Sequence, residues 1–155
     1  MPKANKTTIV PTHDDWVRLA AYIDGEGYIG ILHTKGQRMK SVRYQLKMEV
    51  ANTDIRLGAW CKERFGGCLS IQKTRKNRPK ERPCYHWIVN SQIAASLLRQ
   101  CLPYFIIKRD QAEIAIKFQE TMKRGNFIYP GVLEQRAEMM GKLLSLRPHG
   151  RRKSA

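Results

Sequence analysis

Acidic residues are scarce in this sequence. Its 155 residues include 29 Lys and Arg but only 13 Asp and Glu, which gives a formal net charge of +16. Such an excess of one sign destabilises a compact chain by self-repulsion, so it indicates a polyanionic partner. Nucleic acid is the first candidate and an anionic membrane surface is the second. The charge does not indicate disorder, because 42% of the residues are hydrophobic, enough for one domain with its own core.

Long apolar runs are also missing. No stretch reaches the roughly 20 apolar residues that a membrane-spanning helix needs. The N-terminal sequence MPKANKTTIVP lacks the apolar run of a signal peptide. We therefore expect a soluble, intracellular protein with no membrane partner. It would act in the cytoplasm of a prokaryote or in an organelle, and it would not be secreted.

Motifs of several common enzyme classes are absent as well. The sequence has no G-x-x-x-x-G-K-[ST] loop, no H-E-x-x-H segment and no serine elbow, and its four histidines are scattered. The four cysteines lack paired C-x-x-C spacing, so reduced and mostly buried thiols are the favoured interpretation. A zinc site that uses Cys84 and His86 is the alternative. The cysteines are Cys61, Cys68, Cys84 and Cys101.

What is present is a regular alternation of helix and strand signals. Thr12 and Asp15 have the spacing of a capping box, so a helix is predicted to begin there and to end at the glycines that follow Asp24. Residues 42–50 alternate between polar and apolar, which predicts a half-buried strand. Further strands are predicted over 28–34, 68–74 and 84–90, with a turn at 35–37. Helices are predicted over 54–65, 91–102 (capped by Ser91), 108–123 and from Pro130 to about Leu146.

This pattern predicts one α/β (α+β) domain over residues 12–146, with no internal repeat. A flexible N-terminal segment over 1–11 and a basic flexible tail over 147–155 would flank it. Residues 75–83 form a basic, proline-containing loop that cannot hold a core.

Residues 19–27, LAAYIDGEG, resemble the nine-residue motif of the LAGLIDADG homing endonucleases. Five positions match outright and the other four are substitutions in kind. The order of the first eight predicted elements, helix-strand-strand-helix-strand-strand-helix-helix, is the order of that family. Residues 103–108 also resemble the family's segment ahead of a late helix. The resemblance spans roughly residues 12–145 and implies the LAGLIDADG endonuclease fold, in which a curved antiparallel sheet binds DNA.

The resemblance implies an active site at the end of the motif. Glu26 stands where the family has the acid that binds a divalent metal at the scissile phosphate, and the Gly25 carbonyl is a second candidate ligand. Mg²⁺ is the expected cofactor, and Mn²⁺ or Ca²⁺ can substitute in binding. Lys108 would offset charge on the phosphate, although an ordinary surface lysine is the alternative. Asn52 and Arg56 follow the second strand, where the family places polar and basic groups; both are equally open to structural roles.

A single motif implies a homodimer, because two active sites then require two chains. Small residues let two helices approach closely, although alanine also simply favours helix. The predicted interface comprises Leu19, Ala20, Ala21, Ile23 and Asp24. A two-fold dimer of identical chains would bind a palindromic or pseudo-palindromic site.

The outer face of the sheet is expected to enter the major groove, where base edges are distinguishable. A solvated charged face is the alternative at any single position. The predicted contacts on the strands are Tyr28, Gly30, Leu32, Thr34, Arg43, Gln45, Lys47, Glu49, Ser70, Gln72 and Thr74. Phosphate contacts that position the protein without reading sequence are expected from the basic loop, at Lys73, Arg75, Lys76, Arg78, Lys80 and Arg82.

Together these features predict a site-specific, metal-dependent endonuclease of the intron-encoded kind. It would hydrolyse phosphodiester bonds on both strands of a long, pseudo-palindromic DNA duplex. Two alternatives remain open, an intron maturase that binds folded RNA and a non-cleaving DNA-binding regulator. Glu26 favours cleavage over both, because binding alone would not need a carboxylate beside a polyanion.

Overall fold

The elements follow one another in the order predicted from the sequence. The structure, a computed structural model, describes residues 9–35, 42–74, 76–122 and 129–147. Gly36 and Gln37 of the turn predicted at 35–37, Arg75, residues 1–8 and the tail from 148 lie outside these ranges. The elements are α1 (His13–Glu26), β1 (Gly27–Lys35), β2 (Val42–Asn52), α2 (Ile55–Phe65), β3 (Cys68–Gln72), β4 (Cys84–Asn90), α3 (Ser91–Cys101), a 3-10 turn (Leu102–Tyr104), α4 (Arg109–Glu120) and α5 (Val132–Ser145).

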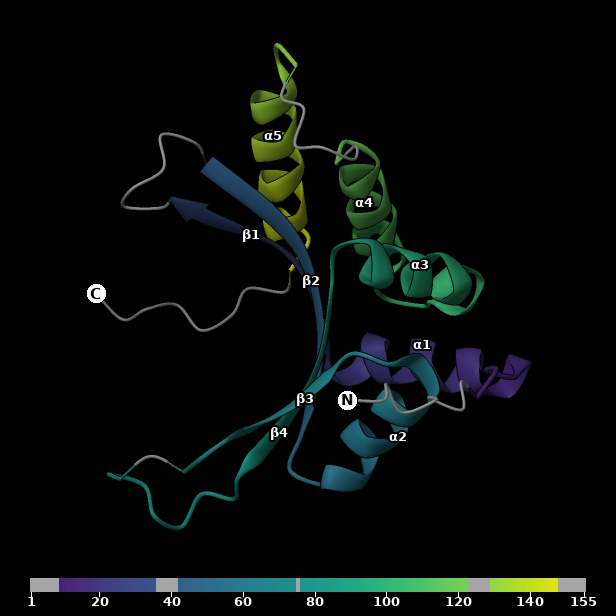
Figure 1. The fold of residues 1–155 in the computed structure, drawn as a ribbon, viewed down its shortest axis with the longest axis vertical. Coiled ribbons are helices and arrows are strands. Elements are labelled where there is room, and N and C mark those ends of the chain that lie inside the picture. The colour runs from purple at the N-terminus through teal and green to yellow at the C-terminus, as the bar shows by residue number, and fades with distance from the viewer. Residues whose placement is uncertain (1–8, 36–41, 75, 123–128, 148–155) are drawn as a thin grey trace, which may run out of the picture.

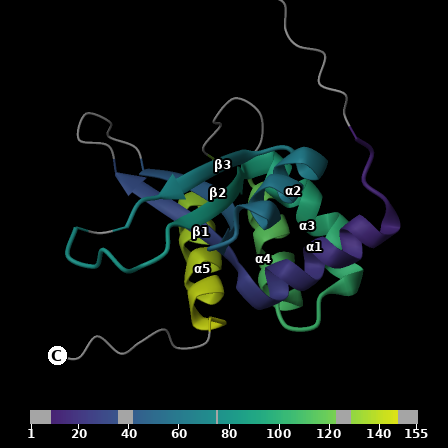
Figure 2. The same cartoon turned by 90° about the horizontal axis from the view of Figure 1, so that it is seen from below.

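The four strands form one antiparallel sheet in the order β1-β2-β4-β3. All five helices lie on one side of this curved sheet, as Figures 1 and 2 show. The described chain places no helix on the opposite face. The predicted α/β class with a curved antiparallel sheet is therefore confirmed. One face of the sheet packs on the helices, and the other is left for a partner or for solvent.

The core lies between the sheet and the helices. The alternating residues of β2 divide as predicted, because Tyr44, Leu46, Met48 and Val50 are buried against the helices. Trp87 of β4 is fully buried, and its indole N–H donates to the Gly66 carbonyl at 2.8 Å. A buried tryptophan needs such a partner for its one polar atom.

Several boundaries differ from those predicted, among them the following three. Gly25, expected to end the first helix, lies inside α1, which continues to Glu26 and has Gly27 as its C-cap. Asn90 rather than Ser91 is the N-cap of α3, and Ser91 is the first helical residue, with a φ of 52°. β3 ends at Gln72, two residues before Thr74. In the first two cases the local preferences of glycine and serine did not decide where the helix ends or begins. At Gly25 the helix is continued by the contact of Lys108 with the end of α1, which is described below.

The four cysteines are free thiols. Cys61 and Cys101 are buried, and burial raises the pKa of each thiol to about 12. Cys84 is half-buried and Cys68 is exposed, so the prediction of buried thiols holds for two of the four. Within the described ranges, no helix combines the length and the hydropathy that crossing a bilayer requires.

The predicted capping box at the start of α1 is confirmed. The Asp15 backbone N–H donates to the Thr12 hydroxyl at 3.3 Å, and the Thr12 N–H donates to the Asp15 carboxylate at 2.9 Å. The second bond lowers the pKa of Asp15, and Arg64 joins the same carboxylate at 3.3 Å. The box fixes where the helix begins, and so which face of α1 meets the core.

Replacing Thr12 by Ala should lower the free energy of unfolding by about 1 kcal/mol, because an N-terminal N–H of α1 loses its acceptor. Urea denaturation followed by circular dichroism measures the change. Thr53→Ala, at an exposed threonine between β2 and α2, is the matched control and should have a smaller effect. Equal losses in the two variants would contradict a capping role for Thr12.

Candidate functional site

The C-terminal end of α1 is held by Lys108, from the segment that precedes α4. The Lys108 ammonium donates to the carbonyl oxygens of Ile23 at 2.6 Å, Asp24 at 3.1 Å and Gly27 at 2.6 Å. The last carbonyls of a helix lack partners within the helix, and a cation there also offsets the negative end of the helix dipole. Burial lowers the pKa of Lys108, and the charge of Asp24 opposes this shift. This cap explains why α1 runs on through Gly25.

Asp24 completes the contact in the opposite direction. Its carboxylate accepts hydrogen bonds from the backbone N–H groups of Ile106 at 2.7 Å, Ile107 at 3.3 Å and Lys108 at 2.9 Å. We call this exchange of hydrogen bonds between α1 and residues 106–108 the Asp24–Lys108 clamp. Gly27 fits beside it because it has no side chain: a Cβ there would lie 2.6 Å from the Ile23 carbonyl oxygen.

Glu26 lies at the exposed end of α1, one residue before β1. The Asn52 side-chain amide donates to its carboxylate at 2.7 Å, and the Asn52 side-chain oxygen accepts from the Asp54 N–H at 2.8 Å. Asn52 is therefore held at both ends and fixes the orientation of Glu26. The structure thus brings together two predicted site residues that lie 26 positions apart.

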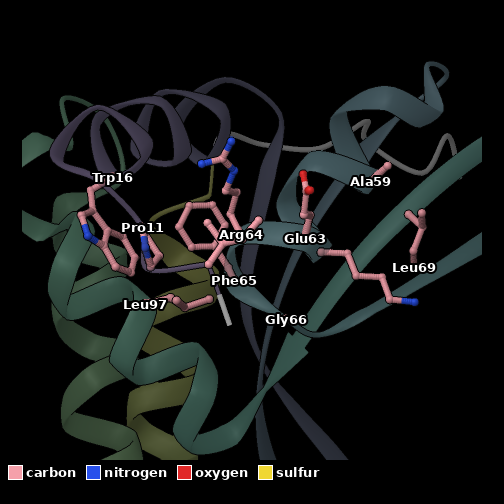
Figure 3. Close-up of a pocket in the computed structure, with 11 residues that line it drawn as sticks. Pro11, Trp16, Ala59, Glu63, Arg64, Phe65, Gly66, Leu69 and Leu97 are labelled. Carbon is pink, nitrogen blue, oxygen red and sulfur yellow. The ribbon is translucent and has the colours of Figure 1, made fainter. Parts of the chain in front are cut away.

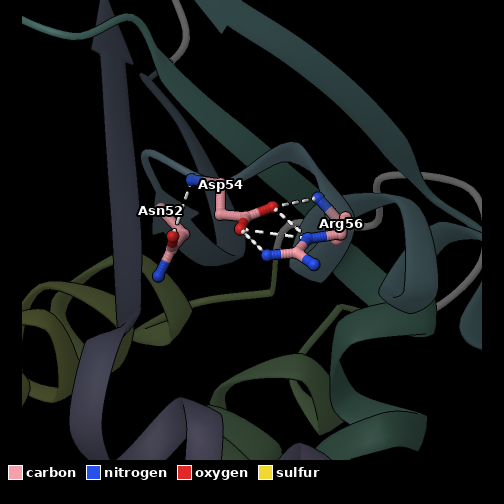
Figure 4. Close-up of polar contacts among 3 residues, drawn as sticks. All are labelled: Asn52, Asp54 and Arg56. Atoms are coloured by element: carbon pink, nitrogen blue, oxygen red, sulfur yellow. Dashed lines mark hydrogen bonds and ion pairs between the residues drawn. The ribbon is translucent and has the colours of Figure 1, made fainter.

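Arg56, the third of the predicted residues, is paired with an acid. Asp54 caps α2 by accepting from the Arg56 N–H at 2.9 Å, and the same carboxylate binds the Arg56 guanidinium at 2.6–3.1 Å (Figure 4). The hydrogen bonds from Arg56 lower the pKa of Asp54 to about 2. The sequence analysis did not single out Asp54, although an aspartate ahead of a helix is an N-cap signal.

A hollow of about 510 Å³ lies beside Asn52, between α1 and the start of α2. It adds Arg18 and Tyr22 to the candidate site, and sequence reasoning missed both. Arg18 and Tyr22 are four residues apart and therefore lie on one side of α1. This spacing was visible in the sequence. The residues that line this hollow are Arg18, Tyr22, Asn52, Asp54, Arg56, Leu57 and Trp60.

Lys108 lines a different and smaller hollow, of about 220 Å³, together with Gly27, Tyr28, Ile29, Gln111 and Arg147. The structure therefore separates Lys108 from the hollow that contains Asn52 and Arg56.

A larger hollow, of about 740 Å³, lies away from the end of α1. Figure 3 shows its mainly apolar wall, formed by side chains such as Trp16, Phe65 and Leu97, with Glu63 and Arg64 at its margin. No group of side chains in this wall resembles the catalytic residues of a hydrolase. We therefore place the candidate site at Glu26, although this hollow is larger.

The strand register places the predicted DNA contacts on one face of the sheet. Residues directly opposite each other in an antiparallel pair share a face. Tyr28, Gly30, Leu32 and Thr34 of β1 are paired with Glu49, Lys47, Gln45 and Arg43 of β2, in that order. Ser70 and Gln72 of β3 are paired with His86 and Cys84 of β4. Thr74 and the loop residues Lys73, Lys76, Arg78, Lys80 and Arg82 are exposed.

Gly30 differs from the other predicted contacts of β1, Tyr28, Leu32 and Thr34, because it is buried. A Cβ at Gly30 would lie 2.3 Å from the Tyr28 hydroxyl and 2.5 Å from the Arg147 guanidinium. The Arg147 guanidinium lies 4.4 Å from the centre of the Tyr28 ring and donates to the Ile29 carbonyl at 3.1 Å. Gly30 therefore offers no surface of its own to a ligand. Arg147, assigned from the sequence to the tail, covers it with Tyr28.

Strand β4 adds outward residues that the sequence analysis left out. The register places His86 and Ile88 on the face that carries Glu49 and Gln72. The strand sequence CYHWIVN does not alternate clearly, so its outward residues could not be chosen before its partners were known.

Comparison with known proteins points to one fold. No family model matches the sequence, and no curated protein matches it. Among solved structures, the homing endonuclease I-CvuI in complex with its target has a TM-score of 0.72 and 17% identity, over 91% of this chain and 87% of that one. The archaeal intron-encoded homing endonuclease I-Vdi141I, complexed with DNA, has a TM-score of 0.74 and 15% identity, over 92% and 89%. The chain has the LAGLIDADG homing endonuclease fold.

A third similar structure of the LAGLIDADG fold is longer. The LAGLIDADG homing endonuclease I-SmaMI, bound to cleaved DNA, has a TM-score of 0.66 and 18% identity, over 86% of this chain and 45% of that one. This chain therefore spans less than half the length of I-SmaMI but most of the length of I-CvuI and I-Vdi141I.

Of the five residues of the LAGLIDADG motif predicted for the interface, Ala21 is exposed and Asp24 is half-buried. Leu19, Ala20 and Ile23 have no exposed surface, because they pack into the core of their own chain. In this chain these three side chains therefore have no free surface with which to contact a second chain. Ala21 and Gly25 are exposed, and open space surrounds the position of a Cβ at Gly25. A helix presents every fourth residue on one side, so the sequence pattern alone did not decide which side faces inward.

Glu26 does not belong to a cluster of three or more metal-ligating side chains among the described residues. Within the part of the chain that the structure describes, no three His, Cys, Asp or Glu residues lie close enough to hold a metal ion. The zinc alternative at Cys84 and His86 thus lacks a third ligand there. At the end of α1, the described residues offer the Glu26 carboxylate and backbone carbonyls as oxygen ligands.

Replacing Lys108 by Met should lower the free energy of unfolding by about 1–3 kcal/mol, because three carbonyl oxygens at the end of α1 lose their donor. Lys62→Met, at an exposed lysine of α2, is the matched control and should change stability by no more than about 0.5 kcal/mol. Guanidinium denaturation compares the two variants. If Lys108→Met were as mild as the control, the clamp would not hold α1.

Proposed function

We propose that this chain is a site-specific, metal-dependent DNA endonuclease that acts as a homodimer on a long, pseudo-palindromic duplex. The observation that carries the proposal is the exposed Glu26 carboxylate, held by Asn52 at 2.7 Å at the end of the motif helix. A carboxylate repels the phosphates of DNA unless a cation lies between them. A protein that only bound DNA would gain nothing from an oriented acid at this position.

The donors at the end of α1 suit a hard divalent cation such as Mg²⁺. The Glu26 carboxylate and the Gly25 carbonyl would hold it, since both are oxygen ligands, and Mn²⁺ or Ca²⁺ would substitute in binding. When bound, the metal would supply an activated water and stabilise charge on the phosphate. In support, DNA complexes of I-CvuI were determined in the presence of Mg and of Ca.

The remaining residues of the site position these groups or face the phosphate. Asn52 orients Glu26, and Arg18 lines the adjacent hollow, where its guanidinium would attract a phosphate. Arg56 lines the same hollow, with its guanidinium paired to the Asp54 carboxylate. All three donors of Lys108 are directed at carbonyl oxygens. We therefore assign Lys108 to positioning the end of α1, in place of the direct contact with phosphate expected from the sequence.

Dimerisation would use the exposed side of α1 and the segment that the clamp holds beside it. Val17, Ala21 and Gly25 are exposed at a spacing of four on this side. Ile106 and Ile107, whose backbones bind Asp24, are 90% and 69% exposed. An apolar surface of this kind beside a stripe of small residues favours close packing of two helices. Packing about a two-fold axis would bring two Glu26 residues together. The greater length of I-SmaMI, about twice this chain, agrees with a need for two copies.

DNA would lie across the open face of the sheet. That face carries Arg43, Gln45, Lys47, Ser70 and Gln72, and the exposed basic loop between β3 and β4 extends it. Neighbours of the same fold, I-CvuI and I-Vdi141I, are in complex with DNA. I-Vdi141I is intron-encoded, and we propose the same origin here.

The test compares wild type with Glu26→Gln on a randomised duplex library, with Mg²⁺ for cleavage and with Ca²⁺ for binding. Glu26→Gln should bind DNA normally but cleave at least about 100-fold more slowly, since even outer partners of metal ligands contribute roughly 10–100-fold. Glu63→Gln, at an exposed glutamate of α2, should cleave like wild type. Undiminished cleavage by Glu26→Gln would reject the assignment of the site. If wild type selected and cut no duplex, structured RNA would be the next substrate class to test.

Replacing Ala21 by Glu should convert the dimer into monomers, because two buried carboxylates would face each other across the small-residue side of α1. Sedimentation velocity at micromolar concentration measures the state, and an unchanged thermal melt shows that the chain still folds. Ala137→Glu, at an exposed alanine of α5, is the matched control and should stay dimeric. A wild-type protein that remained monomeric with and without DNA would refute the homodimer.

A further inference from the structure

A polar network crosses three strands in the middle of the open face. His86 of β4 contacts the Glu49 carboxylate of β2 through Nδ1, and its Nε2 lies 3.1 Å from the side-chain oxygen of Gln72 in β3. Lys47 of β2 forms an ion pair with the same Glu49 carboxylate. We call these four residues the His86 network. The His86 and Glu49 side chains are 20% and 15% exposed, whereas Gln72 is exposed.

The charge on Glu49 fixes one of the two ring nitrogens. Burial tends to raise the pKa of Glu49, but hydrogen bonds from Lys47 and His86 outweigh it and leave the pKa lowered. An ionised carboxylate only accepts hydrogen bonds. The Nδ1 of His86 therefore carries a proton in both states of the ring, and the proton that is gained or lost is the one on Nε2.

This proton decides which way the Gln72 amide points. In the imidazolium, Nε2–H donates to the Gln72 oxygen, and the Gln72 NH₂ group is left to face outward. In the neutral ring Nε2 is an acceptor, so the amide turns over, donates its NH₂ group to the ring and leaves its oxygen facing outward. The two orientations have the same shape, so packing does not oppose the turn.

We propose that His86 sets the hydrogen-bonding group that Gln72 offers to a base pair: a donor when His86 is protonated and an acceptor when it is neutral. This inference rests on the proposed function, because it assumes that the open face meets the major groove. There a donor would favour guanine or thymine, which present acceptors, whereas an acceptor would favour cytosine or adenine, which present amino groups. A free glutamine binds adenine through both ends of its amide, but Gln72 has one end occupied by the ring.

The charged and polar groups that face His86 come from the two strands on either side of β4. From β2, the Glu49 carboxylate attracts the imidazolium and the Lys47 ammonium repels it. From β3, the register places Ser70 opposite His86, and Gln72 is opposite Cys84 of β4.

The first experiment needs no DNA. NMR of the free protein from pH 5 to 8.5 follows the His86 ring nitrogens and the side-chain NH₂ signals of Gln72. Both should change with one midpoint, and His86→Asn should abolish the change at Gln72. His13→Asn, at an exposed histidine of α1, should leave it intact. A Gln72 amide that does not respond to the titration of His86 would overturn the inference, whatever the protein does with DNA.

The second experiment selects duplexes from a randomised library in Ca²⁺ at pH 5.5 and at pH 8. The relevant base pair is the one whose preference is lost in Gln72→Ala. Its preference should move by roughly tenfold from guanine or thymine at low pH to cytosine or adenine at high pH, a change expected for one base contact. In His86→Asn the preference should not depend on pH. An unchanged preference in the wild type would overturn the switch alone, whereas failure to enrich any duplex at either pH would overturn the proposed function and the switch with it.

Discussion

The Asp24–Lys108 clamp fixes the position from which the rest of the candidate site is built. Lys108 binds three carbonyl oxygens at the end of α1, and Asp24 binds three N–H groups of residues 106–108. Each charged group thus binds backbone polar atoms of the other segment, at positions where a helix end leaves some of them without helical partners. Because the exchange runs in both directions, neither segment can move without exposing unpaired polar atoms. The clamp therefore also fixes the positions of Glu26, two residues beyond Asp24, and of the start of β1.

Charges at the site are distributed so that few of them are free. Asp54 neutralises Arg56 and caps α2, and Glu49 is shared by Lys47 and His86. A formal charge of +16 therefore does not produce a uniformly positive surface around the acids. The exposed loop between β3 and β4 carries the cations Lys73, Lys76, Lys80 and Arg82, while the middle of the sheet carries groups whose direction is fixed by their partners. This separation agrees with the division between phosphate contacts, which position a protein, and base contacts, which specify a sequence.

Much of the fold was predictable from the sequence because its signals are local. The Thr12–Asp15 capping box, the alternation of 42–50 and the glycines after Phe65 each depend on neighbouring residues, and each appears as predicted. Glu26 and Asn52 were chosen by resemblance to a family, and the structure brings their side chains into contact.

What could not be predicted depends on residues far apart in the chain. Whether Ala20 or Ala21 faces inward is decided by the sheet and by α3, not by the motif. The cap on α1 comes from Lys108, 81 positions beyond the Gly27 carbonyl that it binds. His86 gains its partners only when β2 and β3 pair with β4. In each case the residue type was visible in the sequence, but its neighbours were not.

The chain passes directly from Glu26 into β1, with no connecting loop. In the proposed enzyme, the acid at the cut and the first groove-contacting side chain, Tyr28, are therefore separated by one residue of extended backbone. The protein then fixes the distance between the scissile bond and the nearest recognised base pair. Substituting bases in a target would weaken binding step by step. Inserting one base pair between the cut and the recognised bases would instead displace every contact of that half-site at once.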